Sequence, residues 1–294
     1  FGVWHEFSRE YASPFLAETG ELVSPGMPQA VLTISGGDTI VLQPNRAVDI
    51  QLAGQVRVVG SGESIVYELD EGESPRVERY NTLATPVGGE YQVELSDGSK
   101  VWLNSLTKLR YPEVFKEDCR EVYLTGEAYF EVVHDEGHPF VVTTDLGNVR
   151  VYGTQFNVRR YVDEEGIRAT LVDGSVGFAK NGQKEDEYIK IEPGYQVRYE
   201  EGQEVVVQKV KVYNEIAWKN HQFSFERKPL DEIMKDFMRW YDVNITFEDE
   251  SLHELYFSAT LNRYGNIETL LRFFEAGYDI KFEINGKNIK VKRK

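Results

Sequence analysis

The sequence predicts an all-β domain, sandwich- or solenoid-like and rich in antiparallel pairs, followed by a small α+β domain of order βαβ-βαββ. Two observations lead to this prediction. Between Asn81 and Val212, short runs of alternating apolar residues recur about every eight to twelve residues, with turn residues between them. After Trp218, two stretches with the apolar spacing of amphipathic helices appear among further short strands.

The amino-acid composition argues against several functional classes of protein for this chain, nucleic-acid-binding proteins among them. The 294 residues are 41% hydrophobic, which is enough to build substantial cores. The chain carries 33 Lys and Arg against 49 Asp and Glu, a formal charge of −16, which disfavours binding to nucleic acid or to an anionic membrane surface. Cys119 is the single cysteine, so an internal disulfide framework is excluded, and we interpret it as an incidental thiol.

From its N-terminal sequence, we expect this chain to be a fragment of a longer protein. The sequence begins at Phe1 without a Met, and it contains neither a signal-peptide pattern nor an apolar run long enough to span a bilayer. Residues 1–20 are expected to form a short helix or packed arm, or else a membrane-proximal or partner-binding strip. The aromatic residues of this arm lie three or four positions apart: Trp4, Phe7, Tyr11 and Phe15.

Residues 21–215 are predicted to form the all-β domain, with N-terminal strands in 21–80. Two alternating runs at 30–34 and 39–42 flank a glycine turn and predict a hairpin. Gly60-Ser61-Gly62 separates two further runs and lacks the third glycine or Lys-Ser/Thr pair of a phosphate-binding loop.

Residues 81–215 form the predicted core of this domain. Tyr91, Val93 and Leu95 alternate with polar residues, and the same pattern continues in the run 101–103. Asp97-Gly98 between the two runs favours a tight turn, which predicts a hairpin.

Residues 216–294 are predicted to form the α+β domain. Pro229 suits the first turn of a helix, and the two acidic residues that follow it favour the positive end of the helix dipole. Asn266 is the expected N-cap of a second helix that ends at Gly277. A final hairpin is expected across Asn285-Gly286.

No pattern predicts catalysis, a cofactor or a metal site. His134 and His138 flank two acidic residues, but Gly137 and Pro139 favour a polar loop over a helix that would align the imidazoles. Nucleotide-binding, serine-hydrolase and zinc-protease motifs are absent from the sequence. The acidic residues are too numerous to select a glycosidase pair by counting.

Eight segments of the all-β part occur in a fixed order: T-P-x-G-G-E-Y at 85–91, L-S-D-G-S-x-V-W-L-N at 95–104, L-x-Y-P at 109–112, G-E-A-Y-F-E-V at 126–132, P-F-V-V at 139–142, G-T-x-F-N-V at 153–158, T-L-V-x-G-S-V at 170–176 and P-G at 193–194. Together they resemble FecR-family anti-sigma factors. The tail 218–292, with R-W-Y-D-V at 239–243, resembles the C-terminal domain that follows the FecR domain in Bacteroidetes members. It is also similar to the short secretin and TonB N-terminal fold.

The resemblance covers roughly residues 25–292 and implies a role in cell-surface signalling. A TonB-dependent outer-membrane transducer would contact this periplasmic part, and an N-terminal cytoplasmic segment would regulate an ECF-type sigma factor. The sigma-binding helices and the single inner-membrane span typical of the family are absent from this sequence. We therefore expect a periplasmic fragment that reaches the sigma factor only through that missing segment.

The resemblance supplies structural residues and no catalytic ones. The glycines are interpreted as backbone positions that need unusual φ or close approach, and the aromatic residues as core. These motif residues are Gly98, Trp102, Asn104, Gly126, Phe130, Gly153, Phe156 and Gly174.

A partner surface is hypothesised on the small domain, where a strand edge could accept a strand of the transducer's signalling domain. The residues named for it are Phe223, Phe225, Leu255 and Phe257. Two alternatives stay open. A carbohydrate-binding β module would show exposed coplanar Trp or Tyr rings, and a glycan hydrolase would show two carboxylates roughly 5 to 10 Å apart in a cleft.

Overall fold

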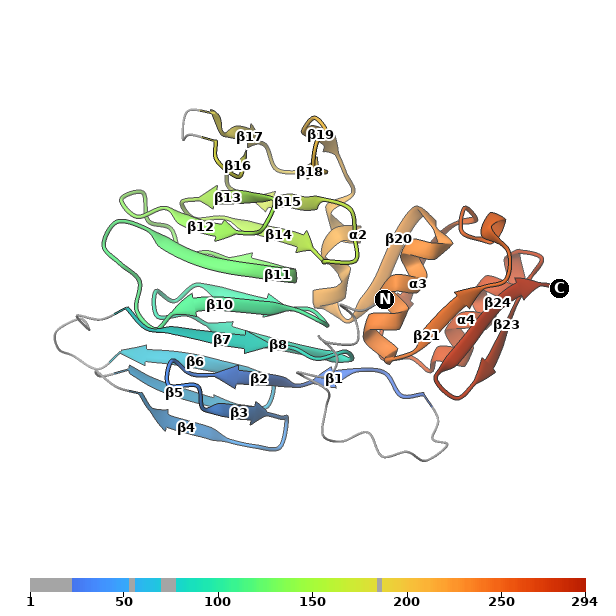
Figure 1. Ribbon diagram of the computed structural model, residues 1–294, viewed down its shortest axis with the longest axis horizontal. Helices are drawn as coiled ribbons and strands as arrows, with labels where there is room; N and C mark the ends of the chain where they lie inside the picture. Colours follow the sequence, from blue (N-terminus) through green and yellow to red (C-terminus); the bar gives the residue numbers. More distant parts are fainter. Residues whose placement is uncertain (1–22, 53–55, 70–77, 184–186) are drawn as a thin grey trace. The chain divides into compact units, whose positions relative to one another are not determined.

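The computed structural model describes residues 23–52, 56–69, 78–183 and 187–294 (Figure 1). Its contacts divide the chain into a β unit, Pro28–Thr85 with Glu90–Val212, and an α+β unit. The α+β unit comprises Tyr213–Lys294, Pro86–Gly89 and the described part of Phe1–Met27. The arm predicted at 1–20 lies outside the described residues, and the domain boundary predicted at 215 stays a prediction.

The strands of the β unit form two sheets that share one strand. After the two-residue β1 (Met27–Pro28), sheet 1 contains, in spatial order, β3 (Thr39–Leu42), β2 (Ala30–Thr33), β7 (Tyr80–Ala84), β10 (Lys108–Pro112), β11 (Arg120–Glu131), β12 (Phe140–Thr143), β13 (Gly147–Val151), β16 (Val176–Lys180) and β17 (Ile189–Ile191). Sheet 2 contains β4 (Val48–Gln51), β5 (Val56–Ser61), β6 (Ser64–Leu69), β8 (Gly89–Glu94), β9 (Lys100–Leu103), β11 again, β14 (Gln155–Arg160), β15 (Ile167–Asp173), β18 (Tyr195–Tyr199) and β19 (Val206–Lys209).

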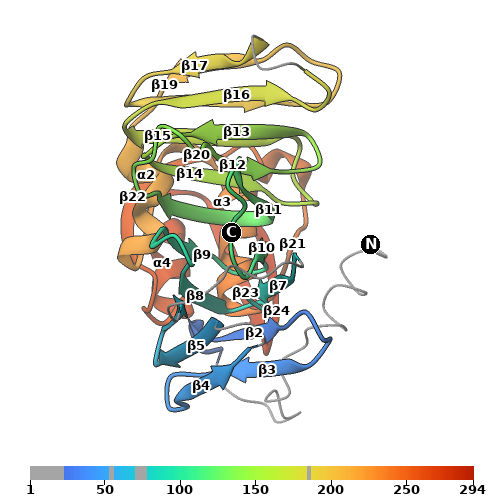
Figure 2. The same ribbon diagram turned by 90° about the vertical axis from the view of Figure 1, so that its left-hand side faces the viewer.

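Spatial order follows chain order through most of both sheets. In Figure 1 and Figure 2 the strand colours of the β unit accordingly change in sequence from blue to yellow. Most neighbours are antiparallel, with parallel pairs at β11–β12 and β6–β8. The predicted all-β fold, sandwich- or solenoid-like and rich in antiparallel pairs, is confirmed.

One hydrophobic core lies between the two sheets. Strands such as β8 bury every second residue, because successive side chains of a strand point to opposite faces. Rings from opposite sheets meet in this core: Tyr67 of β6 lies 5.4 Å from Tyr111 of β10, and Phe178 of β16 lies 6.1 Å from Tyr199 of β18. These contacts join the sheets along the length of the unit.

Strand β11 belongs to both sheets. Its first half pairs with β10 and β12 in sheet 1, and its second half pairs with β9 and β14 in sheet 2. The change occurs at Gly126, whose φ of +106° is one that L side chains rarely adopt. A Cβ at this position would also lie 2.5 Å from Oγ1 of Thr107. Only glycine fits both constraints.

The α+β unit follows the predicted order. Its elements are α2 (Val212–Ile216), η2 (Ala217–Asn220), β20 (Gln222–Pro229), α3 (Leu230–Tyr241), β21 (Asn244–Phe247), η3 (Glu250–Leu252), β22 (Tyr256–Asn262), α4 (Ile267–Gly277), β23 (Ile280–Asn285) and β24 (Asn288–Arg293). Strands β20 and β22 form a two-stranded sheet, and β21-β24-β23 form a three-stranded one. The predicted βαβ-βαββ order is therefore confirmed.

Local sequence explains where both helices begin. Pro229 has φ −67° and extended ψ directly before α3, and Asp231 and Glu232 occupy the first turn. The side chain of Asn266 accepts a hydrogen bond from the N–H of Thr269 and caps α4. The apolar faces of both helices then pack into one core with the two sheets of this unit.

A buried polar cluster lies in the β unit between β2, β6, β7 and β10. Asn81 Nδ2 donates to the hydroxyl of Tyr67 at 2.7 Å, and the Tyr111 hydroxyl donates to the same oxygen at 3.1 Å. The backbone N–H of Ser35 donates to Asn81 Oδ1, and its hydroxyl donates to Oε1 of Glu113 at 3.1 Å. Burial raises the pKa of the Glu113 carboxyl, and the Ser35 hydrogen bond opposes this effect only in part.

Substitution Gly126→Ala is expected to cost about 3–5 kcal/mol of unfolding free energy, because it adds a steric clash to the cost of positive φ. Denaturant unfolding followed by circular dichroism measures this. Gly37→Ala is the matched control: its φ is +88° but a Cβ meets nothing within 4 Å, so about 1–2 kcal/mol is expected. Equal costs at the two positions would contradict the proposed constraint at β11.

Substitution Glu113→Gln is expected to stabilise the protein at pH 7. The pKa of this carboxyl is raised on folding, so its contribution to stability is full below the ordinary pKa of 4.5 and is lost as the pH rises through the folded-state value. The advantage of the variant should shrink as the pH falls towards 4. Unfolding curves of both proteins at several pH values measure this difference, with exposed Glu117→Gln as the control. A constant difference across this range would contradict the assignment.

Candidate functional site

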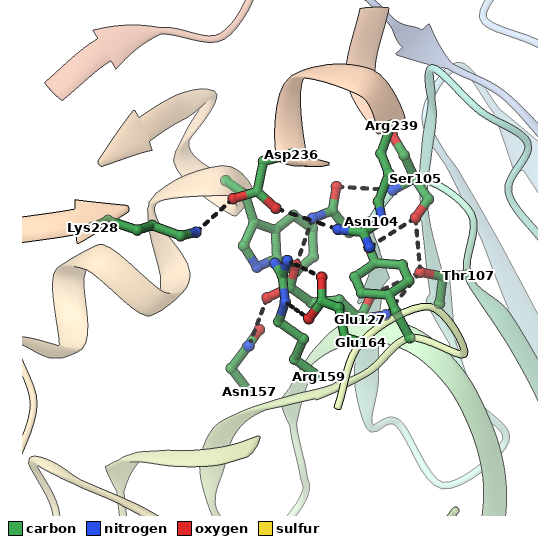
Figure 3. A network of polar contacts seen from close by, with 12 residues as sticks. Asn104, Ser105, Thr107, Glu127, Asn157, Arg159, Glu164, Lys228, Asp236 and Arg239 are labelled. Carbon is green, nitrogen blue, oxygen red and sulfur yellow. Dashed lines mark hydrogen bonds and ion pairs between the residues drawn. The ribbon is translucent and has the colours of Figure 1, made fainter. Parts of the chain in front are cut away.

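A network of buried polar side chains surrounds the bend in β11 (Figure 3). Glu127 directly follows the bend and is only 3% exposed. Its Oε2 accepts hydrogen bonds from Asn104 Nδ2 at 2.8 Å and from a guanidinium N–H of Arg159 at 3.0 Å, while Oε1 accepts from Asn157 Nδ2 at 3.0 Å. The residue directly after β9 and two residues of β14 thus send side chains to a single carboxylate on β11.

Arg159 also binds a second carboxylate. Its Nε and Nη2 donate to the two oxygens of Glu164 at 2.8 and 2.5 Å, in a bidentate pair. All three charged side chains are largely withdrawn from water, with 4% of Glu127, 12% of Arg159 and 10% of Glu164 exposed. Because a buried charge is tolerated only when it is paired and hydrogen-bonded, this arrangement is suited to holding structure.

The loop between β9 and β10 closes the network on its other side. The Thr107 hydroxyl accepts from the N–H of Glu127 at 2.9 Å and donates to its carbonyl at 3.1 Å. The Thr85 hydroxyl in turn accepts from the Thr107 N–H and donates to the carbonyl of Asn104. Leu106 takes a φ of +54° between these contacts. The loop is therefore fixed to the bend by backbone and side-chain hydrogen bonds.

Helix α3 of the α+β unit carries a charged group. Asp236 accepts from Lys228 Nζ at 2.7 Å, and its other oxygen lies 3.6 Å from the guanidinium of Arg239 (Figure 3). In the same helix the carbonyl of Arg239 accepts from the backbone N–H of Gly88 at 2.7 Å. The segment Pro86–Gly89 thereby supplies a donor to one of the last carbonyls of α3.

Arg263 anchors the core of the α+β unit. Its guanidinium lies 3.8 Å above the ring of Trp240, and Nη1 donates to the carbonyl of Trp218 at 3.1 Å. The carbonyl of Arg263 accepts from Trp240 Nε1 at 2.7 Å and from the Tyr241 hydroxyl at 3.0 Å. These contacts tie η2, α3 and the loop after β22 together.

The two strands predicted to bind a partner pair with each other in the structure. Phe223 lies opposite Leu261 and Phe225 opposite Ala259 in the β20–β22 ladder. The rings of Phe223, Phe225 and Phe257 are buried in the core of the α+β unit, and Leu255 is half-buried just before β22. A partner strand would meet the outer backbone edges of this sheet, and that hypothesis stays a prediction.

The motif glycines adopt unusual backbone conformations in the structure. Gly98, Gly126, Gly153 and Gly174 all have positive φ, between +81° and +153°. A Cβ on Gly153 would lie 2.6 Å from His134, and one on Gly174 would lie 2.8 Å from Thr154. At these two positions glycine is therefore required both by the positive φ and by the close approach of neighbouring atoms.

The three motif aromatics do not share one environment. Phe130 and Phe156 are fully buried and stack at 4.9 Å between their centroids. Trp102 instead lies on the face of β9 opposite Val101 and Leu103, where it is half-buried and meets Tyr129 edge to face. It contributes to the outer face of sheet 2, whereas the sequence had predicted a core position.

The histidine loop pairs with its own acidic residue. His138 Nδ1 lies 2.7 Å from Asp135 Oδ2, and this hydrogen bond lowers the pKa of the Asp135 carboxyl.

Within the described ranges, no three His, Cys, Asp or Glu side chains gather as metal ligands. No helix in this part of the chain is both long and apolar enough to cross a membrane.

Comparisons with known proteins identify both units. The model of the FecR protein family matches residues 81–177, and the model described as FecR, C-terminal matches 222–291. The chain belongs to the FecR family. No curated protein matches the chain.

Solved structures agree with this assignment. A crystal structure at 1.65 Å of a candidate anti-sigma factor from Parabacteroides distasonis is 26% identical, with a TM-score of 0.66, and the match covers 72% of this chain and 99% of that one. A second crystal structure with the same description, at 2.50 Å, has the same identity and TM-score and covers 73% and 99%.

The FecR match contains every member of the β11 network. Asn104 and Gly126 were predicted from the sequence as structural residues, whereas Glu127, Asn157 and Arg159 were not. One feature of the sequence could have identified Glu127. It is a charged residue inside a predicted strand, and its chain neighbours are Gly126 and an alanine. Four of the FecR-like segments, 85–91, 95–104, 126–132 and 153–158, therefore contribute Thr85, Asn104, Glu127 and Asn157 to one network around a buried carboxylate.

Substitution Glu127→Gln is expected to lower the unfolding free energy by about 2–4 kcal/mol. The amide removes the charge that Arg159 pairs with and faces the Asn104 and Asn157 donors with a donor of its own. Chemical denaturation measures the change. The control is Glu94→Gln on β8, whose carboxylate is 32% exposed and 3.9 Å from Lys100, where less than about 1 kcal/mol is expected. A similar small loss at both positions would contradict the role of the network.

Proposed function

We propose that this chain is the periplasmic sensory part of a transmembrane anti-sigma factor. In this proposal a TonB-dependent outer-membrane transducer signals to it by protein–protein contact, and the full-length protein regulates an ECF sigma factor. Support comes from the FecR and FecR C-terminal matches on one chain and from the likeness to a candidate anti-sigma factor. Inner-membrane anchoring and sigma-factor contact are assigned to segments outside this sequence.

The observation that carries the contact proposal is the open sheet edges of the α+β unit. In its two small sheets, β20, β22, β21 and β23 each pair with a single strand within the described residues. Each therefore has a second edge with no strand partner in this part of the chain, which is the arrangement that β-augmentation uses.

Neither alternative function gains support from the geometry. Glu127 and Glu164 both bind Arg159, so they are engaged as an ion-paired group and do not resemble a free acid and base. Half-buried Trp102 meets the buried ring of Tyr129 at 63°, and the half-buried rings of Tyr80 and Tyr123 are also inclined at 63°. A sugar-binding platform needs coplanar rings, so protein contact is favoured over carbohydrate binding.

Calorimetric titration of this chain with the isolated N-terminal signalling domain of the TonB-dependent receptor encoded beside it tests the proposal. Binding at micromolar strength or better, about −8 kcal/mol, is expected. The signalling domain of a receptor encoded elsewhere serves as the control and should bind at least about tenfold more weakly. Absence of binding between two folded partners would contradict the proposed function.

A further inference from the structure

A groove of about 520 Å³ lies between α4 and β23 of the α+β unit. Its apolar lining includes Ile267 and Leu271 from the helix and Phe282 and Ile284 from the strand. Ile284 is 38% exposed, so apolar surface remains open to solvent at this end of the groove. A volume of this size accommodates several side chains of an extended segment.

Val23 already lines this groove. It is half-buried and packs against the hydrophobic core of the α+β unit, although it precedes the β unit in the chain. Three residues later Gly26 is buried, and a Cβ there would lie 2.5 Å from the carbonyl of Gly88 and 2.7 Å from the ring of Trp240. Residues 23–26 are thus attached to the unit at two points, and Val23 shows that the groove accepts a branched aliphatic side chain.

The edge of β23 beside the groove is partly capped. The N–H of Phe282 donates to the carboxylate of Glu275 on α4 at 2.8 Å, so it points away from β24. Because hydrogen-bonding direction alternates along an antiparallel strand, Ile284 presents its N–H and C=O to the same open edge. Ile284 therefore offers both backbone groups and an exposed side chain.

The rim of the groove favours an acidic neighbour in the bound segment. Arg272 on α4 and Lys281 on β23 are both exposed, and Lys281 is one of the cations that lower the pKa of the nearby Glu283 carboxyl. Glu268 supplies one carboxylate to the rim, and the carboxylate of Glu275 is engaged by Phe282. Exposed cations on both walls are notable in a chain of formal charge −16.

We propose that this groove binds an extended segment of the transducer's signalling domain, one that places an aliphatic side chain next to a carboxylate, and that this segment displaces Val23. The proposal rests on the receptor-sensing function proposed above and names its contact surface. The chain's own sequence Glu21-Leu22-Val23 has the same chemistry. Displacement would couple receptor binding to release of the segment that precedes the β unit, because the two occupants compete for one surface.

Calorimetric titration of the receptor signalling domain against four proteins tests this proposal. Relative to the wild type, Val23→Ser should bind about fivefold more tightly, because the internal competitor is weakened. Ile284→Asp should bind at least about tenfold more weakly, because it places a charge in the contact. Val206→Asp, at a 51% exposed aliphatic residue of β19, is the matched control and should stay within about twofold. Circular dichroism and thermal unfolding confirm that each variant is folded.

The outcomes separate the two proposals. Absence of wild-type binding overturns the receptor-sensing function, and with it the named occupant. Wild-type binding that Ile284→Asp leaves unchanged overturns the groove alone, and Val23→Ser binding no tighter than the wild type overturns the displacement. Sedimentation that shows a dimer in the wild type and a monomer in Ile284→Asp would assign the groove to a second copy of the chain and overturn the proposed partner.

Discussion

The β unit depends on the single carboxylate of Glu127 at the point where β11 passes from one sheet to the other. A strand shared by two sheets must bend, and at the bend the N–H of Glu127 donates to the hydroxyl of Thr107. The carbonyl of Glu127 accepts from the N–H of Asn104 and from the Thr107 hydroxyl, while its carboxylate accepts from Asn104, directly after β9, and from Asn157 of β14. The hydrogen bonds of the network therefore hold β11 in one position where it leaves the first sheet and enters the second.

The α+β unit is built from segments that lie far apart in the chain. Residues 23–27 and Pro86–Gly89 belong to it together with Tyr213–Lys294, so the chain passes between the units four times. The glycines at 26 and 88 make this possible, since each lets the backbone approach α3 closely. A displacement of Val23 would therefore act on a segment that leads directly into the β unit.

Local signals in the sequence predicted much of the fold. Asp97-Gly98 joins β8 to β9 with Val93 opposite Val101, Pro229 precedes α3, and Asn266 caps α4. These features depend on residues within a few positions of one another, which is the range over which turn and capping preferences operate.

The candidate site was less accessible to sequence reasoning because it is assembled over long distances. Gly126 could be identified as a special backbone position, but that β11 is shared by two sheets depends on strands 20 to 30 residues away. Strand alternation also predicts that Glu127, opposite in face to Phe130 and Ala128, is exposed, whereas both faces of β11 are buried from Gly126 to Phe130. Trp102 was predicted to be in the core as one of the motif aromatics, whereas its alternation with Val101 and Leu103 places it on the other face of β9.

Hydrogen exchange followed by mass spectrometry, with and without the receptor's signalling domain, would show which unit contacts the receptor. We assign the receptor contact to the α+β unit and a structural role to the β11 network. We therefore expect slower exchange in α4 and β23, faster exchange at residues 23–27, and unchanged protection in β11. Protection confined to the strands of the β unit, with α4 and β23 unaffected, would contradict this assignment.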